Sequence, residues 1–133
     1  MALVKFESPK VQDYCDLRVN AGMSPKSIEA AEKGLPNACF NVTIYEQETL
    51  IGMGRVIGDG GTAFQIVDIA VDKNHQGLGY GRKIMEEIMT YIDSVAEKGT
   101  YVSLMADYPA DQRYEKFGFK NTEPYSKGMY IKY

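Results

Sequence analysis

The pattern of apolar and polar positions changes its period along the chain, and each change marks an expected element. Apolar residues recur at helical spacing over residues 9–19, and Ser24-Pro25 supplies a cap and a first helical position for a second helix over 24–33. Period-two alternation and short apolar runs then predict strands separated by polar or glycine-rich turns. The expected strands cover residues 4–6, 40–45, 50–57 and 63–71, with a four-residue turn at 46–49 and a tight turn at 58–61.

The second half of the chain begins with a long amphipathic helix. Its apolar residues Ile84, Ile88, Ile92 and Val95 follow one face over residues 80–98, which predicts packing on a sheet. A buried strand, a short helix and a final strand are expected over residues 101–105, 111–117 and 128–133. This order predicts an α/β fold in which one mixed sheet carries helices on its faces. A length of 133 residues is typical of one compact domain, so we expect residues 1–133 to form a single domain.

Composition removes several functional classes. Hydrophobic residues make up 44% of the chain, and no apolar run approaches the roughly 20 residues of a membrane helix. The first residues lack the apolar stretch of a signal peptide, so we expect a cytoplasmic protein that does not bind membranes. A net charge of −3 without a basic stripe argues against nucleic-acid binding. Cys15, Cys39 and His75 lack the close spacing of metal ligands, so we expect no metal and two free thiols.

A glycine-rich segment stands between the strand at 63–71 and the helix that begins near Tyr80. Its sequence is Gln76-Gly77-Leu78-Gly79-Tyr80-Gly81-Arg82. Glycine allows a sharp turn, and the free amides and positive dipole at the start of a helix favour a phosphate or pyrophosphate. The dinucleotide fingerprint fails because Arg82 occupies its last glycine position, and the Gly-Lys-Ser/Thr tripeptide of nucleoside triphosphate loops is absent. A plain turn without a ligand is the alternative.

Residues 76–81 resemble the Gln/Arg-x-x-Gly-x-Gly/Ala pattern of the GNAT (GCN5-related N-acetyltransferase) superfamily. Two further segments resemble the family in the right order, Asp68-Ile69-Ala70-Val71 and Arg113-Tyr114-Glu115-Lys116-Phe117-Gly118-Phe119. The resemblance implies a single-domain, mostly antiparallel mixed sheet flanked by helices, with a splayed central strand. It also implies acetyl-CoA as co-substrate, no metal, and compatibility with a homodimer.

The resemblance further assigns the coenzyme contacts. The seven loop residues would hold the pyrophosphate of coenzyme A. Main-chain groups of Ile69, Ala70 and Val71 would pair with the pantetheine arm and orient the acetyl carbonyl, with an amide of Ile69 or Val71 stabilising the oxyanion. Asp107 would touch the pantetheine where many members carry Asn, and a turn-forming role is its alternative.

Acetyl transfer to an amine needs a base, because alkyl amines with a pKa of ~10 are mostly protonated at neutral pH. Asp68 lies inside an apolar strand, where a carboxylate has to be paired or used. It is therefore a candidate base or substrate contact, and the alternative is that it holds a neighbouring backbone group or Arg55. Some members of the superfamily place a glutamate where this chain has Gln65, which argues against a histone-type mechanism. Resemblance assigns Tyr114 as the acid beside the coenzyme sulfur, with a core aromatic as its alternative.

The acceptor is the least determined part of the prediction. Arg18 is a candidate for holding the carboxylate of an amino acid or another small zwitterion, and a plain surface arginine is the alternative. The shortness of the chain favours a small-molecule amine over a protein. Acetylation of protein N-termini or lysines, and a module that binds coenzyme A without turnover, stay open as alternatives. His75 is expected in a solvated turn.

Overall fold

The computed structural model describes residues 2–133, which divide into two compact units. The first ends at Ser103 and the second comprises Leu104–Tyr133, and each is described by itself. The first unit contains, in order, β1 (Ala2–Lys5), α1 (Val11–Asn20), α2 (Ile28–Gly34), η1 (Leu35–Asn37), β2 (Phe40–Glu46), β3 (Thr49–Gly58), β4 (Ala63–Val71), η2 (Lys73–His75) and α3 (Tyr80–Val95), and β5 (Tyr101–Leu104) begins in it. The predicted order of helices and strands over this part of the chain is confirmed.

The strands form one five-stranded sheet in the order β1-β2-β3-β4-β5. The three pairings from β1 to β4 are antiparallel, which confirms the mostly antiparallel α/β fold. The hairpin between β2 and β3 is tighter than the expected four-residue turn, because Glu46 pairs directly with Thr49 and Gln47 adopts a positive φ of 57°. Strand β5 joins at the start of β4, where the Tyr101 amide donates to the Thr62 carbonyl over 2.8 Å.

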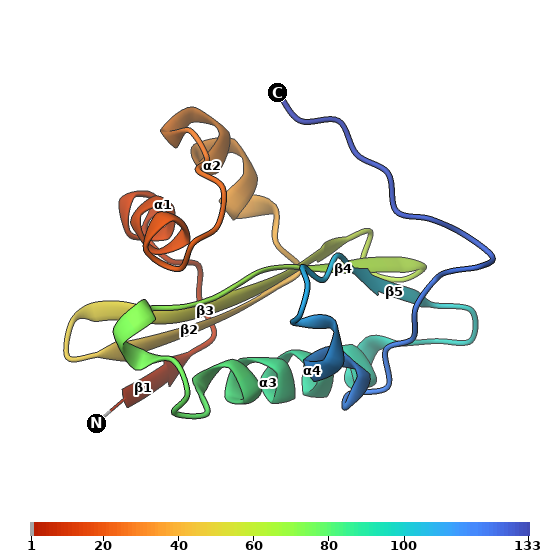
Figure 1. The fold of residues 1–133 in the computed structure, drawn as a ribbon. Coiled ribbons are helices and arrows are strands. Elements are labelled where there is room, and N and C mark those ends of the chain that lie inside the picture. Colours follow the sequence, from red (N-terminus) through yellow and green to blue (C-terminus); the bar gives the residue numbers. More distant parts are fainter. Residues whose placement is uncertain (1) are drawn as a thin grey trace. The chain divides into compact units, whose positions relative to one another are not determined.

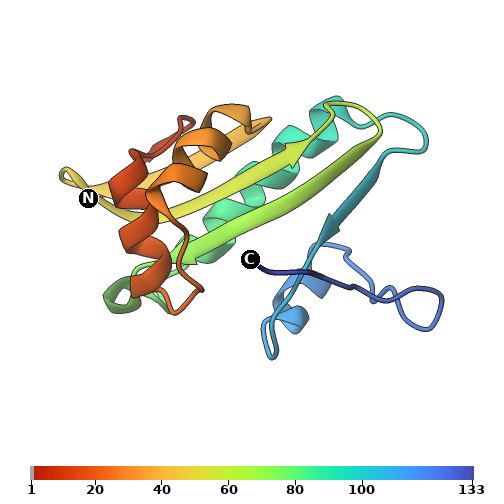
Figure 2. The ribbon, with the colours of Figure 1, turned by 90° about the horizontal axis from the view of Figure 1, so that it is seen from above.

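Helices cover both faces of the sheet (Figures 1 and 2). Helices α1 and α2 lie on one face, where their apolar side chains join residues of β3 and β4 in a buried cluster that includes Tyr14, Leu17, Ala31, Leu35, Met53 and Ala70. Helix α3 lies on the opposite face and buries Ile84, Ile88 and Ile92, as its periodicity predicts. Within residues 2–133, no helix is both long enough and apolar enough to span a bilayer.

Two helix boundaries differ from the prediction. The cap of α2 is Ser27, whose side chain accepts from the Ala30 amide over 3.0 Å, whereas Ser24 accepts hydrogen bonds from Arg18. Arg18 contacts Ser24 outside the helix, and α2 begins after Ser27. Helix α3 ends at Val95 rather than at residue 98, because the following residue, Ala96, is extended.

The second unit contains one short helix, α4 (Asp111–Glu115), and turns. The predicted strand at 128–133 is wrong, since these residues form no ladder with any part of the described chain. Met129, Tyr130 and Ile131 are 81–88% exposed. Alternation of apolar and polar residues is compatible with a strand, but a strand also requires a neighbour to accept and donate its backbone hydrogen bonds.

Candidate active site

The central feature of the site is a bulge in β4. The register of the β3–β4 pair changes between Met53 and Arg55, so that Asp68 and Ile69 both lie opposite Gly54. Asp68 has a φ of 59°, in the left-handed region that an aspartate occupies more readily than most residues. A bulge bends its strand and re-aims the residues that follow. Here those residues are Ile69, Ala70 and Val71, the main-chain segment predicted to contact pantetheine.

The Asp68 carboxylate is held by two arginines from different elements. Arg18 of α1 donates from Nη1 to Oδ1 over 2.5 Å, and Arg55 of β3 donates from Nε to Oδ2 over 2.7 Å. All three side chains are buried, with exposed fractions of 5–11%. The Tyr14 ring lies 5.7 Å from the Arg55 guanidinium, and burial, followed by the Asp68 charge, raises the pKa of Tyr14 to about 12. The cluster therefore places two positive charges and one negative charge in the interior.

This cluster bears on the alternatives that the sequence left open for Asp68 and Arg18, and the catalytic role of Asp68 stays a prediction. The pairing of Asp68 with Arg55 is present, and both carboxylate oxygens accept hydrogen bonds from guanidinium groups. Each oxygen has a further lone pair, but a proton there would neutralise the negative charge that both guanidinium groups contact. Arg18 is 5% exposed, so its interpretation as a surface side chain is wrong. Two further donors of Arg18 bind Ser24, from Nε to the carbonyl over 2.9 Å and from Nη2 to Oγ over 3.2 Å.

The glycine-rich segment forms an open turn at the start of α3. Gly77 and Gly79 have φ values of 78° and 93°, and Gly79 is the N-cap residue without a side-chain cap. A Cβ at either glycine would meet no atom within 4 Å, and one at Gly81 would touch only Val71 at 4.0 Å. The backbone at Gly77 and Gly79 is therefore not crowded by any other part of the described chain.

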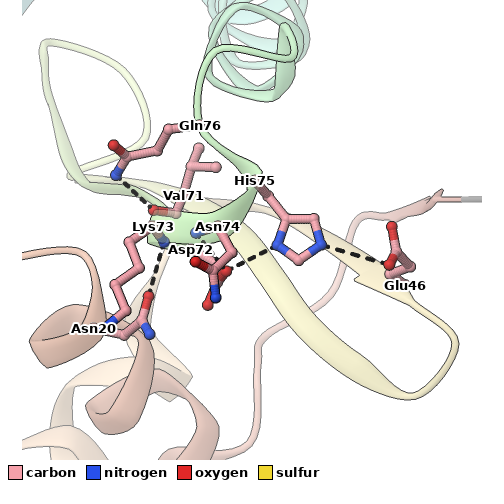
Figure 3. A network of polar contacts seen from close by, with 8 residues as sticks. All are labelled: Asn20, Glu46, Val71, Asp72, Lys73, Asn74, His75 and Gln76. Carbon is pink, nitrogen blue, oxygen red and sulfur yellow. Dashed lines mark hydrogen bonds and ion pairs between the residues drawn. The ribbon is translucent and has the colours of Figure 1, made fainter.

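The other residues of the segment frame this turn. Gln76 donates from Nε2 to the Val71 carbonyl over 3.1 Å, which closes the turn back onto the end of β4 (Figure 3). Leu78 is exposed, and the exposed Arg82 lies 3.6 Å from Glu86 one turn along α3. Tyr80 is half-buried. Uncapped amides with a positive helix dipole suit a pyrophosphate, so this turn fits the pyrophosphate group that coenzyme A carries.

Sequence reasoning missed a polar network beside this turn, drawn in Figure 3. His75 Nδ1 lies 2.8 Å from Asp72 Oδ2, and His75 Nε2 lies 3.5 Å from Glu46 Oε1 at the end of β2. The hydrogen bond to Asp72, followed by that to Glu46, raises the pKa of His75. The Asp72-His75 spacing is visible in the sequence as an i,i+3 pair, but the approach of Glu46 depends on the fold.

The second unit contains the two remaining predicted site residues. Tyr114 is half-buried and packs edge-to-face on Phe119, with ring centroids 6.5 Å apart. Burial raises the pKa of Tyr114, with Asp107 acting in the same direction and Arg113 against it. Asp107 is exposed, and its carbonyl accepts from the Ala110 amide over 2.7 Å in a turn, as its alternative interpretation predicts. The catalytic and coenzyme roles of both residues stay predictions.

Comparison with known proteins identifies the family. The acetyltransferase (GNAT) domain family matches residues 37–121, more than half of the chain. The chain belongs to the GNAT acetyltransferase family. A probable acetyltransferase of unknown function from meticillin-resistant Staphylococcus aureus has a solved structure that is 66% identical, with a TM-score of 0.97 and full coverage of both chains. This GNAT protein therefore has the fold that its loop and strand motifs predicted.

Two curated relatives are more distant. An uncharacterised N-acetyltransferase from Pyropia yezoensis is 23% identical over 91% of this chain and 69% of its own length. The histone acetyltransferase TAP1 of Glycine max is 31% identical over 64% of this chain. The aligned part is 36% of the soybean protein, so this GNAT protein spans about a third of it.

Proposed function

We propose that this GNAT protein transfers the acetyl group of acetyl-coenzyme A to the primary amine of a small molecule. The observation that carries the proposal is the start of α3. Two left-handed glycines precede an uncapped helix terminus there, directly after the bulged end of β4. Together with the family membership, this arrangement supports a site that binds a pyrophosphate and presents main-chain groups to the arm attached to it.

The chain's own groups divide the work of binding. The amides of the segment Gln76–Arg82 hold the pyrophosphate, and the main chain of Ile69, Ala70 and Val71 holds the pantetheine arm. Asp107 is a further candidate contact to that arm. Acetyl-coenzyme A supplies an activated thioester carbonyl and a thiolate leaving group. An amide of Ile69 or Val71 donates to the carbonyl oxygen as negative charge develops on it.

Proton transfer needs one acceptor and one donor. In our proposal a water molecule takes the proton from the amine, since both oxygens of Asp68 are engaged by Arg18 and Arg55. Asp68 then serves the reaction as the anchor of the bulge, and its role as the base is the alternative. The Tyr114 hydroxyl gives its proton to the departing sulfur, and its raised pKa keeps that proton in place at neutral pH.

A small-molecule acceptor is supported by the absence of a carboxylate at Gln65, where some members of the superfamily place a glutamate. The soybean relative is named a histone acetyltransferase, but this chain matches only 36% of that protein. Protein lysines or N-termini are therefore the second class of acceptor, and a coenzyme A sensor without turnover is the third possibility. Arg18 remains the candidate ligand for a carboxylate on the acceptor. To bind it, the Arg18 guanidinium would have to exchange its hydrogen bond to Ser24 for one to the acceptor.

The test is release of free thiol from acetyl-coenzyme A, screened against amino acids, polyamines, aminoglycosides and lysine peptides. Release stimulated by one class of free amine would support the proposal and identify the acceptor. Stimulation only by peptides would replace it with protein acetylation. Competition by free coenzyme A, but not by NAD or ATP, should accompany either result. Coenzyme A binding without turnover on any amine would favour the sensor.

A further inference from the structure

The segment that leads into the glycine-rich turn is held from two sides. The Lys73 amide donates to Oδ1 of Asn20, the last residue of α1, over 3.0 Å. On the other side, His75 of the same short η2 lies against Glu46, the last residue of β2. Figure 3 shows these two attachments on opposite sides of the turn, with Gln76 beside them. These two contacts reach residues 73–76 from α1 and β2, in addition to the local hydrogen bonds from Gln76 to Val71 and from Asn74 to Asp72.

The geometry around His75 favours its protonated form. Both ring nitrogens face carboxylate oxygens, Nδ1 toward Asp72 at 2.8 Å and Nε2 toward Glu46 at 3.5 Å. A carboxylate only accepts hydrogen bonds, and a neutral imidazole has a proton on only one nitrogen. In the neutral form one nitrogen lone pair would therefore face a carboxylate, whereas the imidazolium donates to both.

We propose that His75 is a positioning residue for the co-substrate: in its protonated form it joins Glu46 to Asp72, fixes the entry to the glycine-rich turn, and tightens binding of coenzyme A. The inference rests on the proposed function, since it acts through the segment Gln76–Arg82. It adds a dependence on pH that the family assignment does not contain. Deprotonation of His75 would release the end of β2 from η2. Of the two contacts that reach η2 from α1 and β2, only the hydrogen bond from Lys73 to Asn20 would then remain.

The charges around His75 set the direction of the effect. Glu46 from β2 and Asp72, the N-cap residue of η2, favour the imidazolium, and the Tyr80 ring from α3 lies 6.4 Å from the imidazole. Lys73 is the nearby positive charge on η2, and it acts on Asp72. We call the protonated His75 between Glu46 and Asp72 the latch. The pKa of His75 is raised from 6.5, so the contribution of the latch to coenzyme A binding is complete below pH 6.5 and is lost as the pH rises through the folded-state pKa.

The first measurement uses the fact that His75 is the only histidine in the chain. Its imidazole gives a single C2–H proton resonance, whose pH titration reports the pKa without any ligand. We expect a value above 6.5 in the wild type and a lower value in Glu46→Gln. The matched control is Glu48→Gln, which removes the same charge from an exposed residue two positions away and should leave the titration unchanged.

The second measurement is calorimetric binding of free coenzyme A at pH 6 and pH 9. For each protein we compare the ratio of Kd at pH 9 to Kd at pH 6. This ratio should be about two- to fivefold larger in the wild type and in Glu48→Gln than in Glu46→Gln and His75→Gln, which is the range expected of a partly exposed ion pair. Ionisation of coenzyme A itself contributes equally to all four proteins and cancels when their ratios are compared. Glu46→Gln preserves a hydrogen-bonding side chain at a partly exposed position, so it keeps the test valid if His75→Gln folds poorly.

The outcomes separate the two proposals. An identical ratio of Kd values in all four proteins would overturn the latch while leaving the coenzyme site in place. A histidine pKa at or below 6.5 that Glu46→Gln does not change would overturn it as well. If coenzyme A binds at neither pH 6 nor pH 9, the proposed function is contradicted, and the latch, which rests on it, is contradicted as well.

Discussion

Arg18 of α1 donates a hydrogen bond from Nη1 to Oδ1 of Asp68, a residue that lies 50 positions further along the chain on β4. The contact ties a helix on one face of the sheet to a strand residue whose φ of 59° lies in the left-handed region. Arg55 holds the other oxygen from β3, so three elements meet at the bulge. The shape of the main chain at residues 69–71 therefore depends on a buried charge cluster.

Replacement of Asp68 by Asn tests the anchor. Asn keeps the shape of the side chain and tolerates the left-handed conformation, so the change removes mainly the negative charge. Two buried guanidinium groups then lack their shared partner, and breaking a buried pair in this way costs about 3–5 kcal/mol. Urea unfolding should show a loss of this size for Asp68→Asn, whereas Asp93→Asn on the exposed surface of α3 should change the free energy of unfolding little.

The same variant separates an anchor from a catalytic base. If a water molecule is the base, the folded Asp68→Asn protein should keep the shape of its pH profile of kcat/KM, even where the rate is lower. If Asp68 is the base, the rising limb of that profile should disappear. A stable Asp68→Asn protein that has lost this limb would contradict the anchor and restore the base.

Gly54 permits close packing between the sheet and α3 opposite the bulge. A Cβ there would lie 2.6 Å from Ile84 Cγ2, 2.7 Å from Ile69 Cδ1 and 3.0 Å from Ile88 Cδ1. Gly54→Ala should therefore destabilise the protein by about 1–3 kcal/mol through overpacking. Thermal unfolding measures the effect, and Gly34→Ala is the control because a Cβ at that position meets no atom within 4 Å. Equal melting temperatures for the two variants would show that α3 can shift without cost.

Helix α3 and the bulge in β4 show which features of this protein could be predicted from the sequence and which could not. The period of Ile84, Ile88 and Ile92 determines the buried face of α3, and the glycines before Tyr80 indicate the phosphate-binding turn, because both signals are local. The partners of Asp68 could not be predicted with the same detail. The sequence suggested Arg55 as one alternative, but the approach of Arg18 depends on how α1 lies across the sheet.

Two errors have the same physical origin. Ser24 is a residue type that often caps helices, but here it accepts hydrogen bonds from Arg18. Residues 128–133 have the alternating pattern of a strand, but they have no ladder partner in the described chain. In both places the local propensity was compatible with the prediction, and a tertiary contact, or the lack of one, decided the structure.

Gly79 gives a test of the phosphate-binding turn. Alanine at a φ of 93° costs about 1–2 kcal/mol, and the added Cβ would enter open space at the proposed pyrophosphate site. Gly99→Ala imposes a similar backbone cost at a φ of 90°, also without neighbours within 4 Å, after the end of α3. Both variants should lose similar stability, but only Gly79→Ala should raise KM for acetyl-coenzyme A, by about tenfold or more, as expected for lost hydrogen bonds to a charged group. An equal KM in the two variants would argue against pyrophosphate binding at this turn.

Tyr114 is the predicted donor to the departing thiolate, and Tyr114→Phe removes only its hydroxyl. We expect kcat to fall by about 10²-fold, the lower end of the range for general acid catalysis, with KM for acetyl-coenzyme A nearly unchanged. Because burial raises the pKa of this phenol above its ordinary value of 10.0, the wild-type hydroxyl stays protonated from pH 6 to pH 9, and the loss should be constant across that range. Steady-state kinetics with saturating acceptor measures both constants. Tyr108→Phe, which changes a 90% exposed tyrosine of the same unit, should retain full activity. A Tyr114→Phe enzyme with the wild-type kcat would leave the thiolate to be protonated by solvent and would reduce Tyr114 to a packing partner of Phe119.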